Sequence, residues 1–169
     1  MKINFKEKLQ DIKAFFFDVD GVLTNGQLMI MPGGELLRSM NIKDGYAMQL
    51  AVKKNYVVAI ISGGKSEGVP HRLSNLGITE IHMQVKDKME VYNKLKVKYN
   101  LTDHNILMMG DDMPDIDLLT TAGVATCPAD ACQQVKQCCI YQSQIKGGEG
   151  CVRDIIEQTL TLHGNWNEA

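Results

Sequence analysis

Short strand-like runs alternate with helix-period stretches along most of this chain, and this alternation restricts the folds open to it. The strand-like runs are apolar on consecutive positions, as in "VVAII", which is typical of strands buried on both faces of a sheet. Strands separated by helices form βαβ units, so an α/β fold with a mostly parallel sheet is expected. We predict strands at 13–19, 56–62, 80–85, 105–111 and 123–129, and helices at 44–54, 66–76, 88–99, 114–122 and 129–138.

Two segments depart from this alternation. Residues 27–40 hold two β-like runs around Pro32-Gly33-Gly34, which predicts a small β-hairpin inserted after the first strand. Residues 146–169 hold a glycine-rich loop followed by a last helix. No linker, repeat or second domain interrupts the chain, so we expect residues 1–169 to form a single domain, and 169 residues suffice for a sizeable core.

Composition excludes several classes of protein. The net charge is −2 and Lys and Arg are not clustered, so no nucleic-acid partner is expected. No apolar run approaches the roughly 18 residues of a membrane span, and the charged N-terminal segment has no secretory core, so we expect a cytoplasmic protein without a membrane partner. The five cysteines include no CxxC pair and are interpreted as reduced thiols, and the four histidines share no metal-ligand spacing.

Polar residues follow four successive predicted strands. Asp18 and Asp20 end the first strand, Ser62 the second, Lys88 opens the helix after the third, and Asp111 with Asp112 ends the fourth. Each group alone could be a solvated turn. In an open α/β sheet, however, ligands bind beyond the carboxyl ends of the strands, so the four groups together predict one site.

The residue types at this site indicate phosphate chemistry. Three carboxylates near one point need a cation, and oxygen ligands without His or Cys favour Mg²⁺. A carboxylate beside Ser and Lys donors can attack phosphorus and form an aspartyl-phosphate, while a second carboxylate transfers protons. We therefore predict Asp18 as nucleophile, Asp20 as general acid and base, and Ser62 and Lys88 as ligands of the phosphoryl oxygens.

The segments "DVDGVLT" and "GDDMPD", with Ser62 and Lys88 between them, resemble the motifs of the haloacid dehalogenase-like phosphotransferases. The resemblance implies a Rossmann-like doubly wound parallel sheet with the nucleophile on its central strand. It also implies that Asp18, the backbone carbonyl of Asp20 and Asp111 hold Mg²⁺, with Asp112 and Asp115 in support.

A narrower resemblance is carried by "LTNG", "NIKDG", "KSEGVPHRLSNLGI" and "GGEGCVRD", and by a hairpin where a large cap domain would otherwise stand. These features resemble the capless phosphatases of 3-deoxy-D-manno-octulosonate 8-phosphate (KDO 8-phosphate), an acidic sugar phosphate of lipopolysaccharide biosynthesis. Those enzymes are homotetramers whose neighbouring subunits complete each site. The resemblance implies substrate contacts from Asp20, Asn41, Ile42, Lys43, Asp44, Gly45, Gly64, Arg72, Lys88 and Arg153.

Two departures from that family leave the exact sugar open. Many relatives carry Arg where this chain has Gly64, and some phosphatases of nine-carbon keto-sugar acids carry Glu there. Lys43 replaces an Arg and loses the two-pronged contact with a carboxylate. We expect Arg72, Lys43 and Arg153 to bind the carboxylate of the sugar acid.

Three alternatives stand beside a KDO 8-phosphate phosphatase. The first is a phosphatase of a nine-carbon keto-sugar acid 9-phosphate. The second is a receiver-like signalling module, which would carry its phosphoacceptor Asp after the third strand, whereas the second acidic cluster here follows the fourth. The third is a non-catalytic protein that binds phosphorylated ligands; such a protein would lack the nucleophile, and Asp18 is present.

The predicted hairpin also bears on assembly. Leu28, Met29, Ile30 and Met31 form an apolar row that an isolated exposed ribbon would not favour. We expect the hairpin to pack against copies of itself in a homotetramer.

Overall fold

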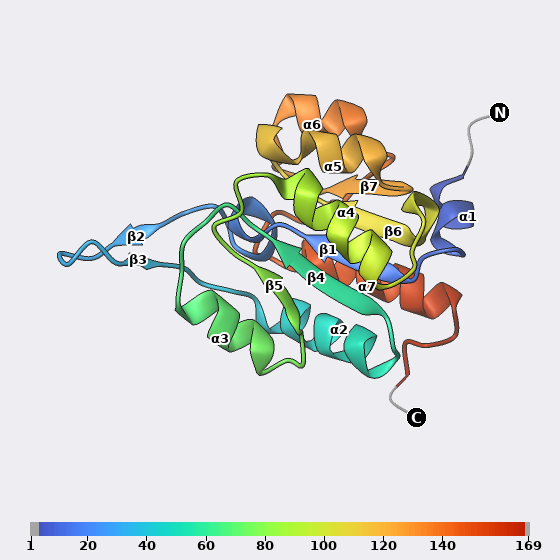
Figure 1. Cartoon of the computed structure of the whole chain (residues 1–169), viewed down its shortest axis with the longest axis horizontal. Coiled ribbons are helices and arrows are strands. Elements are labelled where there is room, and N and C mark those ends of the chain that lie inside the picture. Colours follow the sequence, from blue (N-terminus) through green and yellow to red (C-terminus); the bar gives the residue numbers. More distant parts are fainter. Residues whose placement is uncertain (1–3, 168–169) are drawn as a thin grey trace.

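A six-stranded parallel sheet forms the centre of the molecule in this computed structural model, which describes residues 4–167 (Figure 1). The strand order is β5-β4-β1-β6-β7-β8, and every neighbouring pair runs parallel. The predicted doubly wound α/β fold is confirmed. The strands are β1 (Ala14–Phe17), β4 (Val57–Ile61), β5 (Glu80–His82), β6 (Ile106–Met109), β7 (Val124–Cys127) and β8 (Tyr141–Gln142).

Helices cover both faces of the sheet. One face packs against α1 (Phe5–Leu9), α2 (Ile42–Lys53), α3 (Gly68–Ser74) and α7 (Cys151–Leu162), and the other against α4 (Lys88–Lys98), α5 (Ile116–Thr121) and α6 (Gln133–Cys138). Phe15 and Phe17 of β1 belong to the first core, and Ala14 and Phe16 to the second. Because both faces of β1 are buried, the strand has no polar position. Among residues 4–167, no helix has the length and apolar character needed to cross a bilayer.

The predicted elements are present, with different ends. Helix α6 starts at Gln133 instead of residue 129, because Pro128 to Ala131 close a turn first. Pro70 is the third residue of α3, in the first turn, where its missing N–H costs little. Helix α1 and strand β8 were not predicted. Helix α1 buries only Leu9, and β8 is two residues long, so neither leaves a periodic pattern in the sequence.

The predicted hairpin is present and projects away from the body of the molecule (Figure 1). Strands β2 (Met29–Ile30) and β3 (Leu36–Leu37) pair antiparallel, with Met29 opposite Leu37 and Ile30 opposite Leu36. Both strands are exposed along their length; Ile30 is 75% exposed and Met29 65%. This ribbon is the sole insertion between β1 and α2, so no cap domain follows the first strand.

Candidate active site

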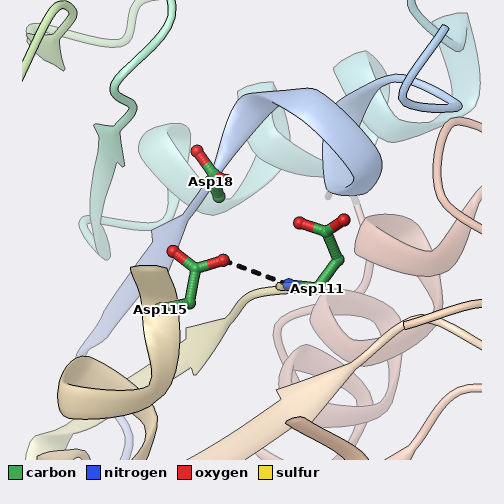
Figure 2. Close-up of side chains that lie close together, drawn as sticks. All are labelled: Asp18, Asp111 and Asp115. Carbon is green, nitrogen blue, oxygen red and sulfur yellow. Dashed lines mark hydrogen bonds between the residues drawn. The ribbon is translucent and has the colours of Figure 1, made fainter. Parts of the chain in front are cut away.

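Three carboxylates meet where β1 and β6 end (Figure 2). Asp18 directly follows β1, Asp111 lies two residues beyond β6, and Asp115 ends the short turn that precedes α5. One carboxylate oxygen from each residue lies within 4.8 Å of the other two. The pairing explains this convergence, since Phe17 of β1 stands opposite Met109 of β6 and both chains leave the sheet side by side.

Lys88, the first residue of α4, is the cation of this cluster. Its Nζ lies 2.7 Å from an oxygen of Asp115 and 3.2 Å from an oxygen of Asp18. The side chain is 9% exposed. Burial alone would lower the pKa of Lys88, but the Asp18 and Asp115 carboxylates outweigh it and hold that pKa above its ordinary value. Lys88 therefore stays charged at neutral pH.

Negative charge is still in excess here. Burial raises the pKa of Asp18 to about 6, with repulsion from Asp115 adding to it. Burial, followed by repulsion from Asp18 and Asp115, raises the pKa of Asp111 to about 7. Such shifts mark carboxylates that lack enough positive charge nearby. Because all three donors are oxygens, the cluster fits a hard divalent cation such as Mg²⁺.

A helical turn follows Asp18, the candidate nucleophile, and packs against Asp111. The wide helical turn Val19–Leu23 begins at Asp18, whose Oδ1 accepts a hydrogen bond of 2.7 Å from the N–H of Val19. Gly21 has a φ of 85°, and a Cβ there would lie 1.9 Å from an oxygen of Asp111. Only glycine satisfies both the backbone angle and the space, so Gly21 lets the turn approach Asp111.

Ser62 lies at the end of β4, next to β1 in the sheet. It is 1% exposed, and its Oγ accepts a hydrogen bond of 3.1 Å from the N–H of Gly64. A Cβ placed on Gly64 would lie 3.4 Å from that Oγ and 2.9 Å from Oδ2 of Asp20. Ser62, Gly64 and Asp20 are therefore close neighbours, as the strand order predicts.

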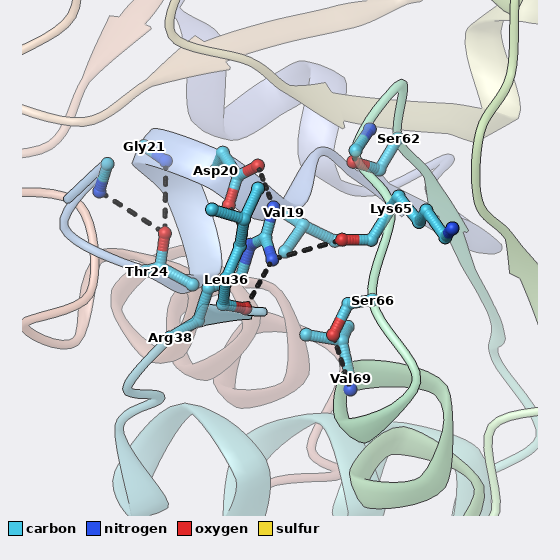
Figure 3. Close-up of polar contacts among 12 residues, drawn as sticks. Val19, Asp20, Gly21, Thr24, Leu36, Arg38, Ser62, Lys65, Ser66 and Val69 are labelled. Atoms are coloured by element: carbon cyan, nitrogen blue, oxygen red, sulfur yellow. Dashed lines mark hydrogen bonds and ion pairs between the residues drawn. The ribbon is translucent and has the colours of Figure 1, made fainter. Parts of the chain in front are cut away.

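The carboxylate of Asp20 points towards Arg38 (Figure 3). Nε and Nη2 of Arg38 donate to its two oxygens at 2.6 and 3.0 Å. Sequence reasoning missed Arg38. It stands just after the second hairpin strand, and no local pattern indicates that the hairpin reaches back to Asp20. A lone cation in the apolar "ELLRSM" run was the only signal.

Asp112 and Asp115, which were both expected to support the metal ligands, lie in different surroundings. Asp112 is exposed and accepts a hydrogen bond from the N–H of Met113, outside the carboxylate cluster. Asp115 is 1% exposed and lies inside the cluster, where its Oδ2 also accepts from the N–H of Asp111 at 3.1 Å. Asp115 therefore both positions Asp111 and contributes charge to the site.

The structure has two cavities that separate the basic residues expected to bind a sugar acid. One, the hairpin cleft, has a volume of about 710 Å³ and is lined by residues of the hairpin and α3 that include Arg38, Lys65 and Arg72. The other, the α7 groove, has a volume of about 860 Å³ and is lined by residues that include Lys43 and Arg153. The hairpin cleft adjoins Asp20 through Arg38, so Arg72, unlike Lys43 and Arg153, lies on the side of Asp20.

The segment from Asn41 to Gly45 starts α2. Asn41 caps the helix by accepting a hydrogen bond from the N–H of Lys43 at 2.8 Å, and Ile42 is 77% exposed. Gly45 lies under Arg72, because a Cβ there would be 2.8 Å from Nη2 of Arg72. This segment therefore contributes to the surroundings of Arg72 mainly through its backbone.

Asp44 points inward from the same segment. It is 1% exposed, and its Oδ1 accepts a hydrogen bond of 2.7 Å from the N–H of Arg153. Its Oδ2 has no partner among residues 4–167. Burial raises the pKa of Asp44 to about 6, against hydrogen bonds from the start of α7 that lower it. The carboxylate therefore joins α2 to α7.

The guanidinium of Arg153 is occupied within its own chain. It pairs with Glu157 at 2.9 Å and lies over the rings of Tyr46 and Trp166, at 5.8 and 5.3 Å from their centres. Cation–π contacts of this kind hold an arginine in place at a partly exposed surface. Arg153 thus fixes one wall of the α7 groove.

Comparison with known proteins agrees with this geometry. A family model described as haloacid dehalogenase-like hydrolase matches residues 72–153. The 3-deoxy-D-manno-octulosonate 8-phosphate phosphatase KdsC of Escherichia coli K12 is 32% identical over 162 residues, which are 96% of this chain and 86% of the relative. The chain belongs to the haloacid dehalogenase-like phosphatases. It is therefore an enzyme, and neither a receiver-like module nor a non-catalytic binding protein.

Solved structures of this family superpose closely. The KDO 8-phosphate phosphatase of Yersinia pestis gives a TM-score of 0.93 at 28% identity, covering 97% of this chain and 89% of that one. The enzyme of Moraxella catarrhalis, solved with a magnesium ion, a phosphate ion and KDO, gives 0.93 at 29% identity, covering 98% and 95%. The likeness extends over almost the whole chain, the hairpin included.

Proposed function

We propose that this chain is a Mg²⁺-dependent phosphatase that hydrolyses KDO 8-phosphate to KDO and inorganic phosphate. The observation that carries the proposal is the strand-end cluster, in which Lys88 bridges Asp18 and Asp115 beside Asp111. The choice of sugar rests on relatives that bear this activity in their names, and on one that holds magnesium, phosphate and KDO together.

The proposed metal ligands are the carboxylates of Asp18 and Asp111 and the backbone carbonyl of Asp20, with Asp112 and Asp115 in support. The excess negative charge of the cluster supports this set. When bound, Mg²⁺ would neutralise part of the negative charge on the phosphoryl oxygens.

The reaction then uses two carboxylates in different roles. An oxygen of Asp18 attacks phosphorus, and the bond from phosphorus to the sugar oxygen breaks as that oxygen takes a proton from Asp20. A water molecule next attacks the aspartyl-phosphate and gives a proton to Asp20, which releases phosphate and restores Asp18. Lys88 and Ser62 donate hydrogen bonds to the phosphoryl oxygens in both steps.

We assign the sugar to the hairpin cleft, because this cavity adjoins Asp20 and carries Arg72. Gly45 and Gly64 leave space beside it, since a side chain at either position would crowd Arg72 or Asp20. Lys43 and Arg153 line the α7 groove instead. Their proposed contact with substrate therefore requires a neighbouring subunit or a rearrangement of the α7 surface.

The same proposal includes a homotetramer in the cytoplasm. Six apolar side chains of the hairpin are more than a third exposed, which supports packing against other copies. They are Leu28, Met29, Ile30, Met31, Leu36 and Leu37. All five cysteines are free thiols, which fits a reducing compartment.

A panel of phosphate esters tests the function. KDO 8-phosphate, a nine-carbon keto-acid 9-phosphate, glucose 6-phosphate and p-nitrophenyl phosphate are assayed for phosphate release with Mg²⁺ and with excess EDTA. We expect the highest kcat/KM for KDO 8-phosphate, and loss of turnover in EDTA that Mg²⁺ restores. A higher kcat/KM for the nine-carbon ester would show that this ester, and not KDO 8-phosphate, is the preferred substrate. Undiminished turnover in EDTA would contradict the proposed need for Mg²⁺.

The Asp18→Asn variant is the matched control for the chemistry. The amide cannot attack phosphorus, so turnover of every ester should fall by at least about 10³-fold, while the variant stays folded. Wild-type rates in purified Asp18→Asn protein would remove Asp18 from the mechanism.

A further inference from the structure

We propose that Arg38 is a positioning residue that holds the catalytic carboxylate of Asp20 from the hairpin. The inference rests on the proposed role of Asp20 as general acid and base. It gives the hairpin a part in the chemistry, in addition to any part in assembly.

The contact between Arg38 and Asp20 fixes both partners. The guanidinium donates to both oxygens of Asp20, at 2.6 and 3.0 Å, in the two-pronged geometry that only arginine offers a carboxylate (Figure 3). Its remaining nitrogen, Nη1, donates to the carbonyls of Leu36 and Lys65, both at 3.2 Å. One side chain therefore ties Asp20 to the hairpin and to the loop after β4.

The side chains of Arg38 and Asp20 differ strongly in exposure. The Arg38 side chain is 3% exposed, whereas that of Asp20 is 34% exposed. The carboxylate is much more open to a substrate than the guanidinium that holds it. Arg38 is therefore placed to act through Asp20, and not as a direct ligand of the sugar.

Gly64 provides the space for this pair. A Cβ at residue 64 would lie 2.9 Å from Oδ2 of Asp20 and 3.2 Å from Nη2 of Arg38. Any side chain at residue 64 would therefore press on both members of the pair. The absence of a side chain at Gly64 therefore leaves room for the contact between Arg38 and Asp20.

Positioning matters because a general acid must point at the leaving oxygen. Misplacement of a reacting group by about 1 Å can cost on the order of 10²-fold in rate. Such a loss is greatest for an ester with a poor leaving group, which needs the proton most. The dependence on leaving group separates a role through Asp20 from a purely structural one.

The experiment compares phenyl phosphate with p-nitrophenyl phosphate, two esters of similar shape whose leaving groups differ. For Arg38→Met we expect kcat on phenyl phosphate to fall roughly 10- to 100-fold, with a smaller loss on p-nitrophenyl phosphate and little change in KM. Arg38→Lys should recover part of the loss. Lys94→Met, which removes an exposed cation on α4, is the control and should leave both rates unchanged.

Combining variants makes the test stricter. Asp20→Asn should show the same dependence on leaving group, and adding Arg38→Met to it should cost no more, because residues that act as one unit are not additive. Full additivity, an equal loss on both esters, a raised KM at constant kcat, or unchanged rates would each overturn the inference. A fully active Asp20→Asn protein would instead contradict the proposed mechanism.

Gly64→Ala keeps the test decisive if Arg38→Met does not fold. It retains both members of the pair and should reproduce the dependence on leaving group. Lys94→Met again serves as the control and should behave like the wild type. Wild-type rates in Gly64→Ala would overturn the proposed coupling.

Discussion

The strand-end cluster and the hairpin depart from ordinary protein surfaces in opposite ways. The cluster buries charge: Asp115 is 1% exposed and Asp18 8%. The hairpin exposes apolar surface, most of all at Met29 and Ile30. Charges are seldom buried unless they are paired, and large apolar patches are seldom left open. Lys88 compensates part of the buried charge of the cluster within the chain, whereas the proposed homotetramer would cover the apolar surface of the hairpin from outside.

Removing Lys88 should break the cluster. Lys88→Met leaves Asp18 and Asp115 without their cation, and loss of one partner from a buried ion pair costs about 3–5 kcal/mol. We expect the free energy of unfolding in urea at pH 7 to fall by about that amount, and Mg²⁺ to restore part of it by supplying positive charge.

The exposed pair of Lys94 and Glu90 gives the matched control for that measurement. The Lys94 side chain is 71% exposed, so Lys94→Met should change the free energy of unfolding by less than about 0.5 kcal/mol. Equal effects of the two lysine variants would show that the cluster is not held together by Lys88.

Asp44 sharpens the comparison, because it is a buried acid without a cation of its own. Its pKa is about 6 in the folded protein against 3.8 ordinarily, so the native state binds the proton more tightly than the unfolded chain. The tighter binding of this proton stabilises the folded protein fully below pH 4, and this contribution is lost as the pH rises through 6. The free energy of unfolding changes by up to about 3 kcal/mol over this range.

The Asp44→Asn variant should not show this dependence. From pH 4 to pH 7, the free energy of unfolding of the wild type should decrease relative to that of Asp44→Asn. Asp11→Asn, at an exposed acid, should follow the wild type. A constant difference between wild type and Asp44→Asn at all pH values would refute the buried-acid explanation.

A substitution in the hairpin is expected to change the assembly of the protein and not the free energy of unfolding of the single chain. Ile30→Asp places a charge on a side chain that is 75% exposed in the single chain, so its folding energy should change by less than about 0.5 kcal/mol. If the hairpins pack together in the proposed tetramer, light scattering should report smaller particles for Ile30→Asp than for the wild type. Val97→Asp, at an 81% exposed residue of α4, should leave the particle size unchanged. Ile30→Asp protein that remains tetrameric would locate the interface elsewhere.

The strand-end cluster could be predicted because the sheet does the positioning. Asp18 and Asp111 follow neighbouring parallel strands, so their positions after these strands in the sequence already bring them close together in the fold. The hairpin could be predicted as a local turn, but its contact with Asp20 could not. That contact depends on how the chain returns from the hairpin to the body of the molecule, which the hairpin's own residues do not encode.

The basic residues show the same limit. Arg72 and Arg153 lie on helices α3 and α7, and nothing local distinguishes them. The structure places Arg72 in the hairpin cleft and turns Arg153 towards Tyr46 and Trp166. Long side chains of this kind take their direction from tertiary neighbours, so type and spacing alone do not decide which cavity they serve.

The glycine-rich loop before α7 affects how the enzyme folds during its synthesis. A Cβ on Gly147 would lie 1.9 Å from the carbonyl oxygen of Gly21, and the N–H of Gly148 donates to the carbonyl of Val22 at 2.9 Å. The turn that presents Asp18 therefore rests against residues made much later by the ribosome. During synthesis Asp18 emerges early and unsupported, and the site reaches its final form only after the loop before α7 has followed. A nascent chain thus completes the surroundings of Asp18 only after Gly147 and Gly148 have been made.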